Sequence, residues 1–126
     1  MSDEAPIRRV QRSRRPAPSE WFEGRVEIEP VLEQADPELR QARVHFHDGA
    51  HTRWHLHLGD QVLYFVEGRG MAEDAGGVRF ECDPGDVVHV PTGTRHRHGA
   101  APGSSATHIA VTAGESVWEG DPRYPG

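Results

Sequence analysis

The chain has 126 residues, the length of one domain of ordinary size, so we expect one compact core and not a multidomain protein. With 35% hydrophobic and 27% charged residues, and with 14 glycines and 10 prolines, the composition is that of a polar globular protein and not of a low-complexity chain. The net charge of −6 argues against nucleic acid as a partner, because binding to a phosphate backbone needs a basic face.

Residues 1–19 form a basic segment that we interpret as a flexible N-terminal arm. The segment carries serine, proline and five arginines without apolar periodicity. No apolar segment follows the pair Arg14-Arg15, so we expect no export signal. No run approaches the roughly 20 apolar residues that cross a bilayer, so we expect no membrane partner. The single Cys82 cannot form an internal disulfide, which favours a cytoplasmic location.

The pattern in residues 20–114 is typical of an all-β sandwich or barrel. Short segments of alternating apolar and polar residues are separated by turn residues, and none keeps a helical apolar period over about 10 residues. The link Gly76-Gly77 predicts a hairpin between two of these segments. Residues 115–126 are irregular, and we expect a C-terminal tail there. The predicted strands lie at 21–32, 41–46, 52–58, 61–66, 71–75, 78–81, 87–90, 95–99 and 107–112.

The nine histidines cluster in the middle of the chain, and two pairs have i, i+2 spacing on predicted strands. His55 and His57 point to one face of a strand, and His96 and His98 point to one face of another, because side chains alternate along a strand. Neutral imidazole is the commonest protein ligand for transition metals. Gln61 lies six residues beyond His55 and can direct its amide oxygen into the same space. The pattern therefore predicts a metal site inside the barrel.

A structural role is the alternative for these histidines, either on the surface or in the core with hydrogen bonds to the backbone. We favour the metal site, because two such pairs about forty residues apart occur in one small domain. A zinc-finger type of site is disfavoured, since one cysteine cannot supply the thiolates of such a site. We therefore expect a catalytic or ligand-binding metal with an open coordination position.

Two spaced motifs in this region resemble those of the cupin superfamily. The first motif is glycine, five residues, His-x-His, three or four residues, glutamate, six residues and glycine. The second motif is glycine, five residues, Pro-x-Gly, two residues, histidine, three residues and asparagine. The corresponding residues are Gly49, His55, His57, Gln61 and Gly68 for the first motif and Gly85, Pro91, Gly93, His96 and Ala100 for the second. Glutamine thus replaces the glutamate, and alanine replaces the asparagine.

The resemblance implies a cupin jelly-roll β-barrel that binds one divalent transition metal. The implied ligands are His55, His57, Gln61 and His96. The glutamine ligand is similar to that of small bacterial cupins with a three-histidine-one-glutamine site, some of which are manganese-dependent hydroxynitrile lyases. Manganese or iron is the metal expected first, and zinc, nickel or copper are alternatives. His89 and Arg97 depart from that group, so the substrate is not carried over.

The expected chemistry follows from the charge of the ligands. Three imidazoles and an amide are neutral, so a divalent ion keeps its full formal charge and is a strong Lewis acid. Proton transfer then falls to a neighbouring group, and His98 and His108 are the candidates, although either could instead orient a ligand imidazole. We expect a small-molecule substrate and lyase chemistry of the hydroxynitrile-lyase type. A quercetinase-like dioxygenase acting on an enol and a binding protein without turnover are the alternatives.

Alternation also places side chains around the predicted site. Leu63 and Phe65 fall on the ligand side of their strand and are expected to line the pocket. His45 and His47 are expected on the exterior of the barrel. His51 is expected at the rim.

The N-terminal strand at 25–32 lies outside the two motifs. An unpaired edge strand is usually covered or paired, and cupins commonly form dimers by exchanging or abutting such strands. We therefore expect a homodimer.

Overall fold

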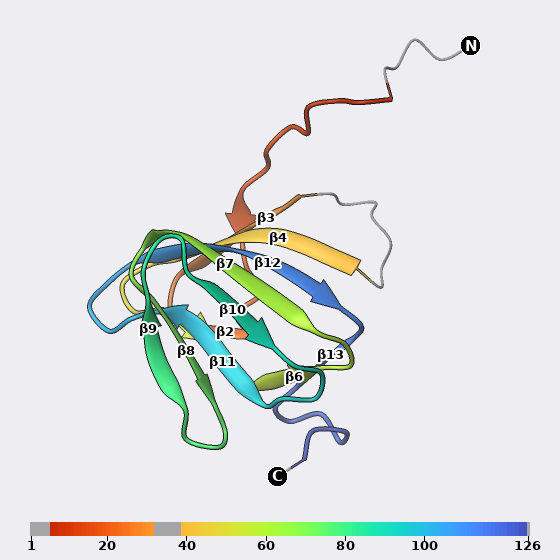
Figure 1. The fold of residues 1–126 in the computed structure, drawn as a ribbon, viewed down its shortest axis with the longest axis vertical. Coiled ribbons are helices and arrows are strands. Elements are labelled where there is room, and N and C mark those ends of the chain that lie inside the picture. Colours follow the sequence, from red (N-terminus) through yellow and green to blue (C-terminus); the bar gives the residue numbers. More distant parts are fainter. Residues whose placement is uncertain (1–5, 32–38, 126) are drawn as a thin grey trace.

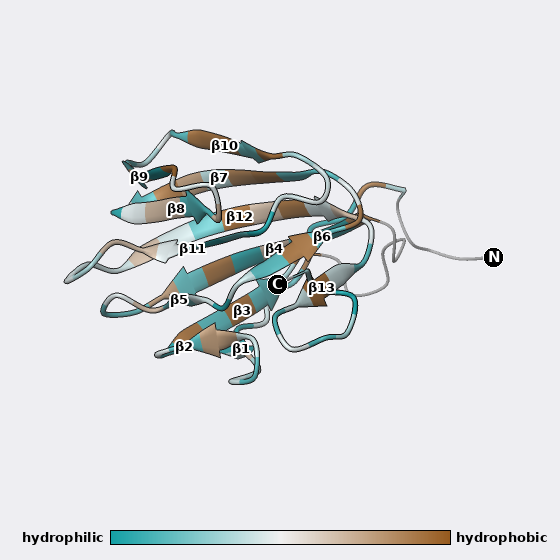
Figure 2. Ribbon diagram, turned by 90° about the horizontal axis from the view of Figure 1, so that it is seen from below, coloured by the Kyte–Doolittle hydropathy of each residue, from teal (hydrophilic) through white to brown (hydrophobic). Residues whose placement is uncertain are grey.

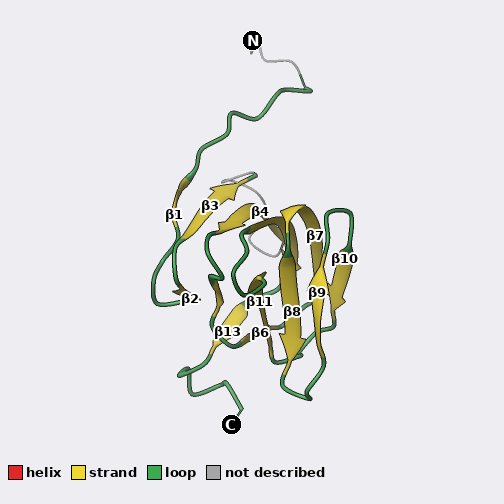
Figure 3. Ribbon diagram, turned by 90° about the vertical axis from the view of Figure 1, so that its left-hand side faces the viewer, coloured by secondary structure: helices red, strands yellow, loops and turns green. Residues whose placement is uncertain are grey.

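The computed structural model describes residues 6–31 and 39–125. All regular elements in these two ranges are strands, which turns and loops connect (Figure 3). None of the described residues belongs to a helix long and apolar enough to span a membrane. The strands are β1 (Arg15–Pro16), β2 (Phe22–Glu23), β3 (Val26–Pro30), β4 (Leu39–Phe46), β5 (His51–Thr52), β6 (His55–His57), β7 (Gln61–Gly68), β8 (Gly70–Asp74), β9 (Arg79–Cys82), β10 (Val87–Val90), β11 (His96–Ala100), β12 (Ala106–Ala113) and β13 (Ser116–Trp118).

The described strands form two antiparallel sheets that curl around a common interior (Figure 1). One sheet has the order β1-β3-β4-β12-β7-β10, and the other has the order β13-β6-β11-β5-β2. The hairpin β8–β9 joins the second sheet because β8 also pairs with β11. The prediction of an all-β jelly-roll barrel is confirmed.

Alternation along β7 shows how the sequence separates the interior from the exterior. Gln61, Leu63 and Phe65 are buried, whereas Tyr64 and Val66 are exposed. Apolar and polar segments interleave along the other strands as well (Figure 2). Leu63 and Phe65 therefore face inward as predicted, but they pack in a core cluster instead of forming the wall of the large cavity. The cluster consists of Leu63, Phe65, Ala72, Cys82, Val88 and Val90.

A glycine divides the first predicted strand between the two sheets. Gly24 has a φ of +85°, and a Cβ added there would lie 2.8 Å from the Cβ of Ala50. A residue with a side chain is strained in this backbone conformation, so the position favours glycine. The segment 21–32 is consequently not one strand, because β2 pairs with β5 in one sheet and β3 pairs with β4 in the other.

Strand β3 is paired along both of its edges. It pairs with β4 on one side and, over two residues, with β1 from the N-terminal arm on the other. Arg12 of the arm also donates two hydrogen bonds of 2.7 Å to the carboxylate of Glu29 on β3. The described part of β3 therefore offers no open edge of the kind on which the homodimer prediction rested, and the homodimer stays a prediction.

A short strand lies in the segment expected to be an irregular tail. Strand β13 pairs with β6, and the register places Ser116 opposite His57 and Trp118 opposite His55. The C-terminal segment therefore brings side chains next to two of the predicted metal ligands.

Candidate metal centre

Three imidazoles from two paired strands converge inside the barrel. His55 and His57 lie on β6, and His96 on β11 is the register partner of His55. The ring centroid of His55 lies 4.3 Å from that of His96 and 4.9 Å from that of His57. All three side chains are buried. The structure thus brings together the three histidines that the two motifs implied.

Hydrogen bonds to the backbone set the tautomers of two of these imidazoles. His55 Nδ1 lies 2.8 Å from the carbonyl oxygen of Arg53, and His96 Nδ1 lies 2.7 Å from that of Thr94. A carbonyl oxygen only accepts, so each Nδ1 carries the hydrogen in the neutral ring. Each Nε2 therefore keeps its lone pair, which is the form that binds a metal ion.

His57 is oriented by a side chain from the C-terminal strand. Its Nδ1 lies 2.9 Å from Ser116 Oγ, and its Nε2 is buried without a hydrogen-bond partner among the described residues. Burying a polar atom without a partner is unfavourable. The unpartnered Nε2 is consistent with a ligand atom for a metal ion.

Gln61 supplies the fourth donor from the opposite sheet. Its Nε2 donates to Thr112 Oγ1 at 2.8 Å, which directs the amide oxygen away from Thr112. Gln61 Oε1 lies 3.1 Å from His96 Nε2. The amide is thus fixed with its oxygen at the imidazole cluster.

Burial keeps these imidazoles neutral. Loss of water lowers the pKa of His57 to about 3, and the electrostatic effects of the neighbouring His96 and Arg40 side chains act in the same direction. Burial also places the pKa of His55 well below its usual value and lowers that of His96. Because a metal ligand must be deprotonated, three neutral imidazoles and one amide oxygen fit a divalent transition metal.

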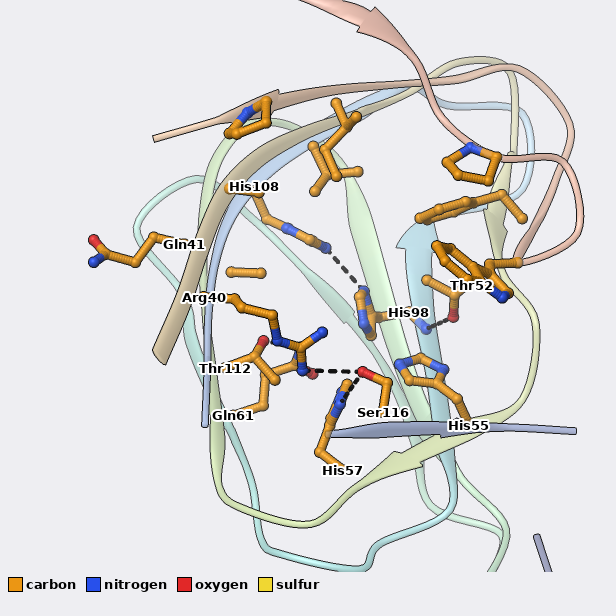
Figure 4. A pocket seen from close by; sticks show the side chains of 18 of the residues that line it. Arg40, Gln41, Thr52, His55, His57, Gln61, His98, His108, Thr112 and Ser116 are labelled. Carbon is orange, nitrogen blue, oxygen red and sulfur yellow. Dashed lines mark hydrogen bonds between the residues drawn. The ribbon is translucent and has the colours of Figure 1, made fainter. Parts of the chain in front are cut away.

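His98 and His108 form a second buried pair beside this cluster (Figure 4). His98 Nδ1 and His108 Nε2 lie 2.8 Å apart, and burial lowers the pKa of both rings. His98 Nε2 and His108 Nδ1 are buried without hydrogen-bond partners in the described part of the chain. Both predicted proton-transfer residues are therefore brought to the site.

His98 also lies close enough to act as a ligand. In the described ranges, His55, His96 and His98 form a group whose candidate ligand atoms all lie within 4.8 Å of one another. His57 is outside that group, although its ring centroid is 5.2 Å from that of His96. We favour His57 as the ligand, because its Nδ1 is held by Ser116 as a ligand imidazole requires, whereas His98 Nδ1 contacts another imidazole.

A cavity of about 890 Å³ opens onto the cluster. One wall is aromatic, since Trp118 stacks on His55 at 4.3 Å between ring centroids and on Trp21 at 5.5 Å. Arg40 reaches into the cavity near Gln61 (Figure 4). The cavity thus combines an apolar wall, a cation and three of the four candidate ligands, namely His55, His57 and Gln61.

Sequence reasoning missed Ser116, Trp118 and Arg40. Strand β13 has three residues, which is too short for alternation to be recognised, and a proline-rich segment follows it. Arg40 lies one residue before residue 41, where the predicted strand starts, whereas the observed strand β4 starts at Leu39. Its position two residues before Ala42 on the inward face was the available signal.

The remaining histidines differ in burial, since His45 is buried, His47 and His51 are half-buried and His89 is exposed. His45 lies on the outer face of β4 as expected, but it is buried there and not exposed to solvent. Its Nε2 lies 2.8 Å from Glu29 Oε1 and its Nδ1 lies 3.0 Å from Thr107 Oγ1. His47 is half-buried beside Glu27.

Comparison with known proteins gives a family match and a set of relatives. A family model described as "Cupin domain" matches residues 42–113. The chain is 44% identical over 95 residues to an (R)-mandelonitrile lyase from Granulicella tundricola, covering 75% of this chain and 72% of that protein. It is 33% identical over 82 residues to an acireductone dioxygenase from Parasynechococcus marenigrum, covering 55% of this chain and only 44% of that protein.

Solved structures show the same fold. A cupin-like protein from Thermotoga maritima superposes with a TM-score of 0.76 at 29% identity, covering 91% of this chain and 88% of that chain. A predicted oxalate decarboxylase from the same organism superposes with a TM-score of 0.72 at 22% identity, covering 88% of this chain and 100% of that chain. At 22% identity, the similarity to the predicted oxalate decarboxylase concerns the fold alone.

Proposed function

Because the chain belongs to the cupin family, we propose that it is a metal-dependent enzyme for a small molecule, with Lewis-acid lyase chemistry like that of a hydroxynitrile lyase. The convergence of four neutral donors with fixed orientation is the observation that carries this proposal. The 44% identity to an (R)-mandelonitrile lyase supports the choice of lyase chemistry.

His55, His57, His96 and Gln61 are the proposed ligands of one divalent ion, with manganese or iron preferred. When bound, the ion would supply a Lewis acid of full formal charge +2, since none of the four donors is charged. His55 and His96 are held by backbone carbonyls, and His57 is held by Ser116. These contacts fix the ligand set before a substrate enters the cavity.

The His98–His108 pair is the proposed proton acceptor. One hydrogen lies between His98 Nδ1 and His108 Nε2 when both rings are neutral. If His98 donates that hydrogen, its Nε2 keeps a lone pair and can accept a proton from the substrate. The Nδ1 proton can then pass to His108 Nε2, so the charge is shared by two buried rings.

This proton transfer matches the needs of cyanohydrin cleavage. The substrate hydroxyl loses its proton to His98 Nε2, and the oxygen forms a carbonyl as the carbon–cyanide bond breaks. The bonding pair leaves with cyanide, which takes the proton back from the His98–His108 pair and departs as hydrogen cyanide, so that both rings are neutral again. The aromatic wall at Trp21 and Trp118 suits an apolar substituent on the reacting carbon.

The test is cyanide release from mandelonitrile by protein loaded with manganese or iron. We expect release above the spontaneous rate, loss of release after chelation, and loss in His96→Ala. Arg43→Gln, which removes a charge on the outer face of β4, is the matched control and should retain activity. No release across a panel of aromatic and aliphatic cyanohydrins with the metal bound would overturn the lyase proposal.

A dioxygenase is the second candidate, and the similarity to acireductone dioxygenases favours it. In that case the same cavity holds an enolate substrate, and oxygen consumption with an enol replaces cyanide release as the readout. An oxygen electrode distinguishes the two, since cyanohydrin cleavage consumes no oxygen. Metal-dependent ligand binding without either reaction would favour a binding protein.

A further inference from the structure

Two arginines of the N-terminal arm bind the outer face of the barrel. Arg12 donates from Nε and NH2 to the carboxylate of Glu29 at 2.7 Å, and Arg14 NH2 donates to Glu27 Oε1 at 3.0 Å. Glu27 and Glu29 lie two residues apart on β3, so both point to the same face of the strand. The arm is thus fastened to β3 by two neighbouring ion pairs, which we call the latches.

Each latch carboxylate also contacts a histidine and a second arginine of the barrel. These partners are His45 at 2.8 Å and Arg43 at 3.6 Å for Glu29, and His47 at 2.8 Å and Arg25 at 3.5 Å for Glu27. A buried charge without a partner is costly, but these partners remain when the arginine of the arm leaves. The side chains of Arg12 and Arg14 are 65% and 43% exposed, so water already solvates part of each. The latches can therefore open without leaving a buried charge unpaired.

The docked arm forms part of the wall of the large cavity. Arg15 and Pro18 are among the lining residues, and Arg15 is the register partner of Ile28, which lines the cavity as well. Between them, Ala17 donates its backbone N–H to the carbonyl oxygen of Val26 at 2.9 Å. Figure 3 shows β1 lying along β3 at this side of the barrel. Detachment of the arm therefore uncovers the edge of β3 next to the cavity.

The arm is anchored at its C-terminal end by Trp21. The carbonyl oxygen of Trp21 accepts the backbone N–H of Arg53 at 2.8 Å, and its ring stacks on Trp118 at 5.5 Å between centroids. The N–H of Trp21 donates to the carbonyl oxygen of Pro18 at 3.2 Å, which closes a turn. This turn separates the latched part of the arm from its anchor, so it is the natural pivot.

We propose that residues 12–18 form a strap that opens and closes one side of the cavity. The two latches hold the strap shut, and the turn before Trp21 lets it swing away from β3 while Trp21 stays in place. Because the latches lie at the surface, salt screens them, and opening is favoured at high ionic strength. The inference concerns entry to the cavity and holds whichever reaction takes place there.

Exchange of the Ala17 amide hydrogen measures opening of the strap, because its hydrogen bond to Val26 breaks when the strap leaves. We expect its protection to fall about 5-fold in Arg12→Gln and further when Arg14→Gln is added. In the wild type it should fall between about 0.05 M and about 1 M salt. The amide of Phe65 in the barrel should keep its protection in all cases, which shows that the fold is intact.

Entry to the cavity is measured with the neutral fluorescent probe N-phenyl-1-naphthylamine by stopped flow, counting only the signal that excess benzyl alcohol displaces. We expect the double variant to bind the probe faster than the wild type at low salt. We also expect the rate to rise with salt in the wild type and to be nearly independent of salt in the double variant. Arg69→Gln removes an exposed ion pair at the β8–β9 hairpin and is the matched control, which should behave as the wild type.

The two measurements test the two parts of the inference separately. Unchanged protection of Ala17 in the double variant would overturn the role of the latches. Faster exchange of Ala17 with an unchanged rate of probe entry would show that the strap opens without controlling the cavity, which overturns the proposed gate. Displaceable probe binding by none of the proteins would overturn it as well.

Discussion

His98 and His108 share a hydrogen bond of 2.8 Å between two fully buried imidazoles, with the outer nitrogen of each ring unpartnered among the described residues. His98 also belongs to a group with His55 and His96 whose candidate ligand atoms lie within 4.8 Å of one another. Such a pair can take up a proton at one end and distribute the charge over both rings. Its position beside the proposed ligands makes it the first target for mutation.

Replacement of His98 by glutamine is expected to slow turnover strongly without loss of metal. General base catalysis contributes about 10²- to 10⁴-fold, so the rate should fall by that order. His57→Ala, by contrast, should lose both metal and activity, because it removes a ligand. Elemental analysis and steady-state rates on the same preparations check both outcomes. Metal loss in His98→Gln with metal retained in His57→Ala would instead assign His98 as the ligand, as the group of His55, His96 and His98 allows.

The Gln61→Glu variant is expected to bind the metal more tightly and to have a lower turnover rate. A carboxylate lowers the formal charge of the ligated ion from about +2 to about +1, so the ion becomes a weaker Lewis acid. Thr112 Oγ1, which accepts a hydrogen bond from the Gln61 amide, can rotate its hydroxyl hydrogen and donate to the carboxylate instead. Metal affinity from competition with a chelator and the rate of the metal-loaded variant test this. A variant with unchanged affinity and rate would remove Gln61 from the ligand set.

The metal-free protein is expected to lose stability as the pH falls from about 6.5 toward 4. Burial lowers the pKa of His108 from 6.5 to about 4, so in this window the unfolded state binds a proton that the folded state does not. The stabilisation is complete above pH 6.5 and is lost as the pH falls through the folded value. Urea unfolding of His108→Gln should show a smaller pH dependence, by up to about 1.4 kcal/mol per pH unit. An unchanged pH dependence would contradict a buried, neutral His108.

Metal removal is expected to lower the melting temperature. A metal present at about 100 times its dissociation constant stabilises the folded state by about 2.7 kcal/mol, which corresponds to a shift on the order of 10 °C for a domain of this size. Readdition of manganese or iron should restore the original value. Elemental analysis of protein purified without added metal identifies the native ion. Equal melting temperatures with and without chelator would argue against a resident metal.

The homodimer predicted from the sequence is tested by light scattering at micromolar concentration. We expect twice the mass of the chain. Because β3 is paired with β1 and β4, a dimer must form through another surface or through exchange of β1 between chains. Deleting residues 1–19 separates these cases, since exchange requires the arm. A monomeric mass at this concentration would contradict the predicted homodimer.

The sequence by itself determined the all-β fold and the two paired-histidine strands. Strand alternation has a period of two, so the inward direction of His55, His57, His96 and His98 can be obtained from spacing alone. The same rule placed Leu63 and Phe65 in the interior. It could not show that they lie in a core cluster away from the cavity, because a strand pattern separates inside from outside but not one part of the interior from another.

Only the tertiary structure decided what surrounds the histidines. Ser116 and Trp118 reach His57 and His55 through the pairing of β13 with β6, about sixty residues apart in the chain. Likewise, Arg40 enters the cavity because three strands are in register, and His45 is buried because Glu29 and the arm cover an outer face. Local sequence patterns predict the direction in which a side chain points. Its contacts depend on which distant strands pair, and that pairing follows from closure of the whole barrel.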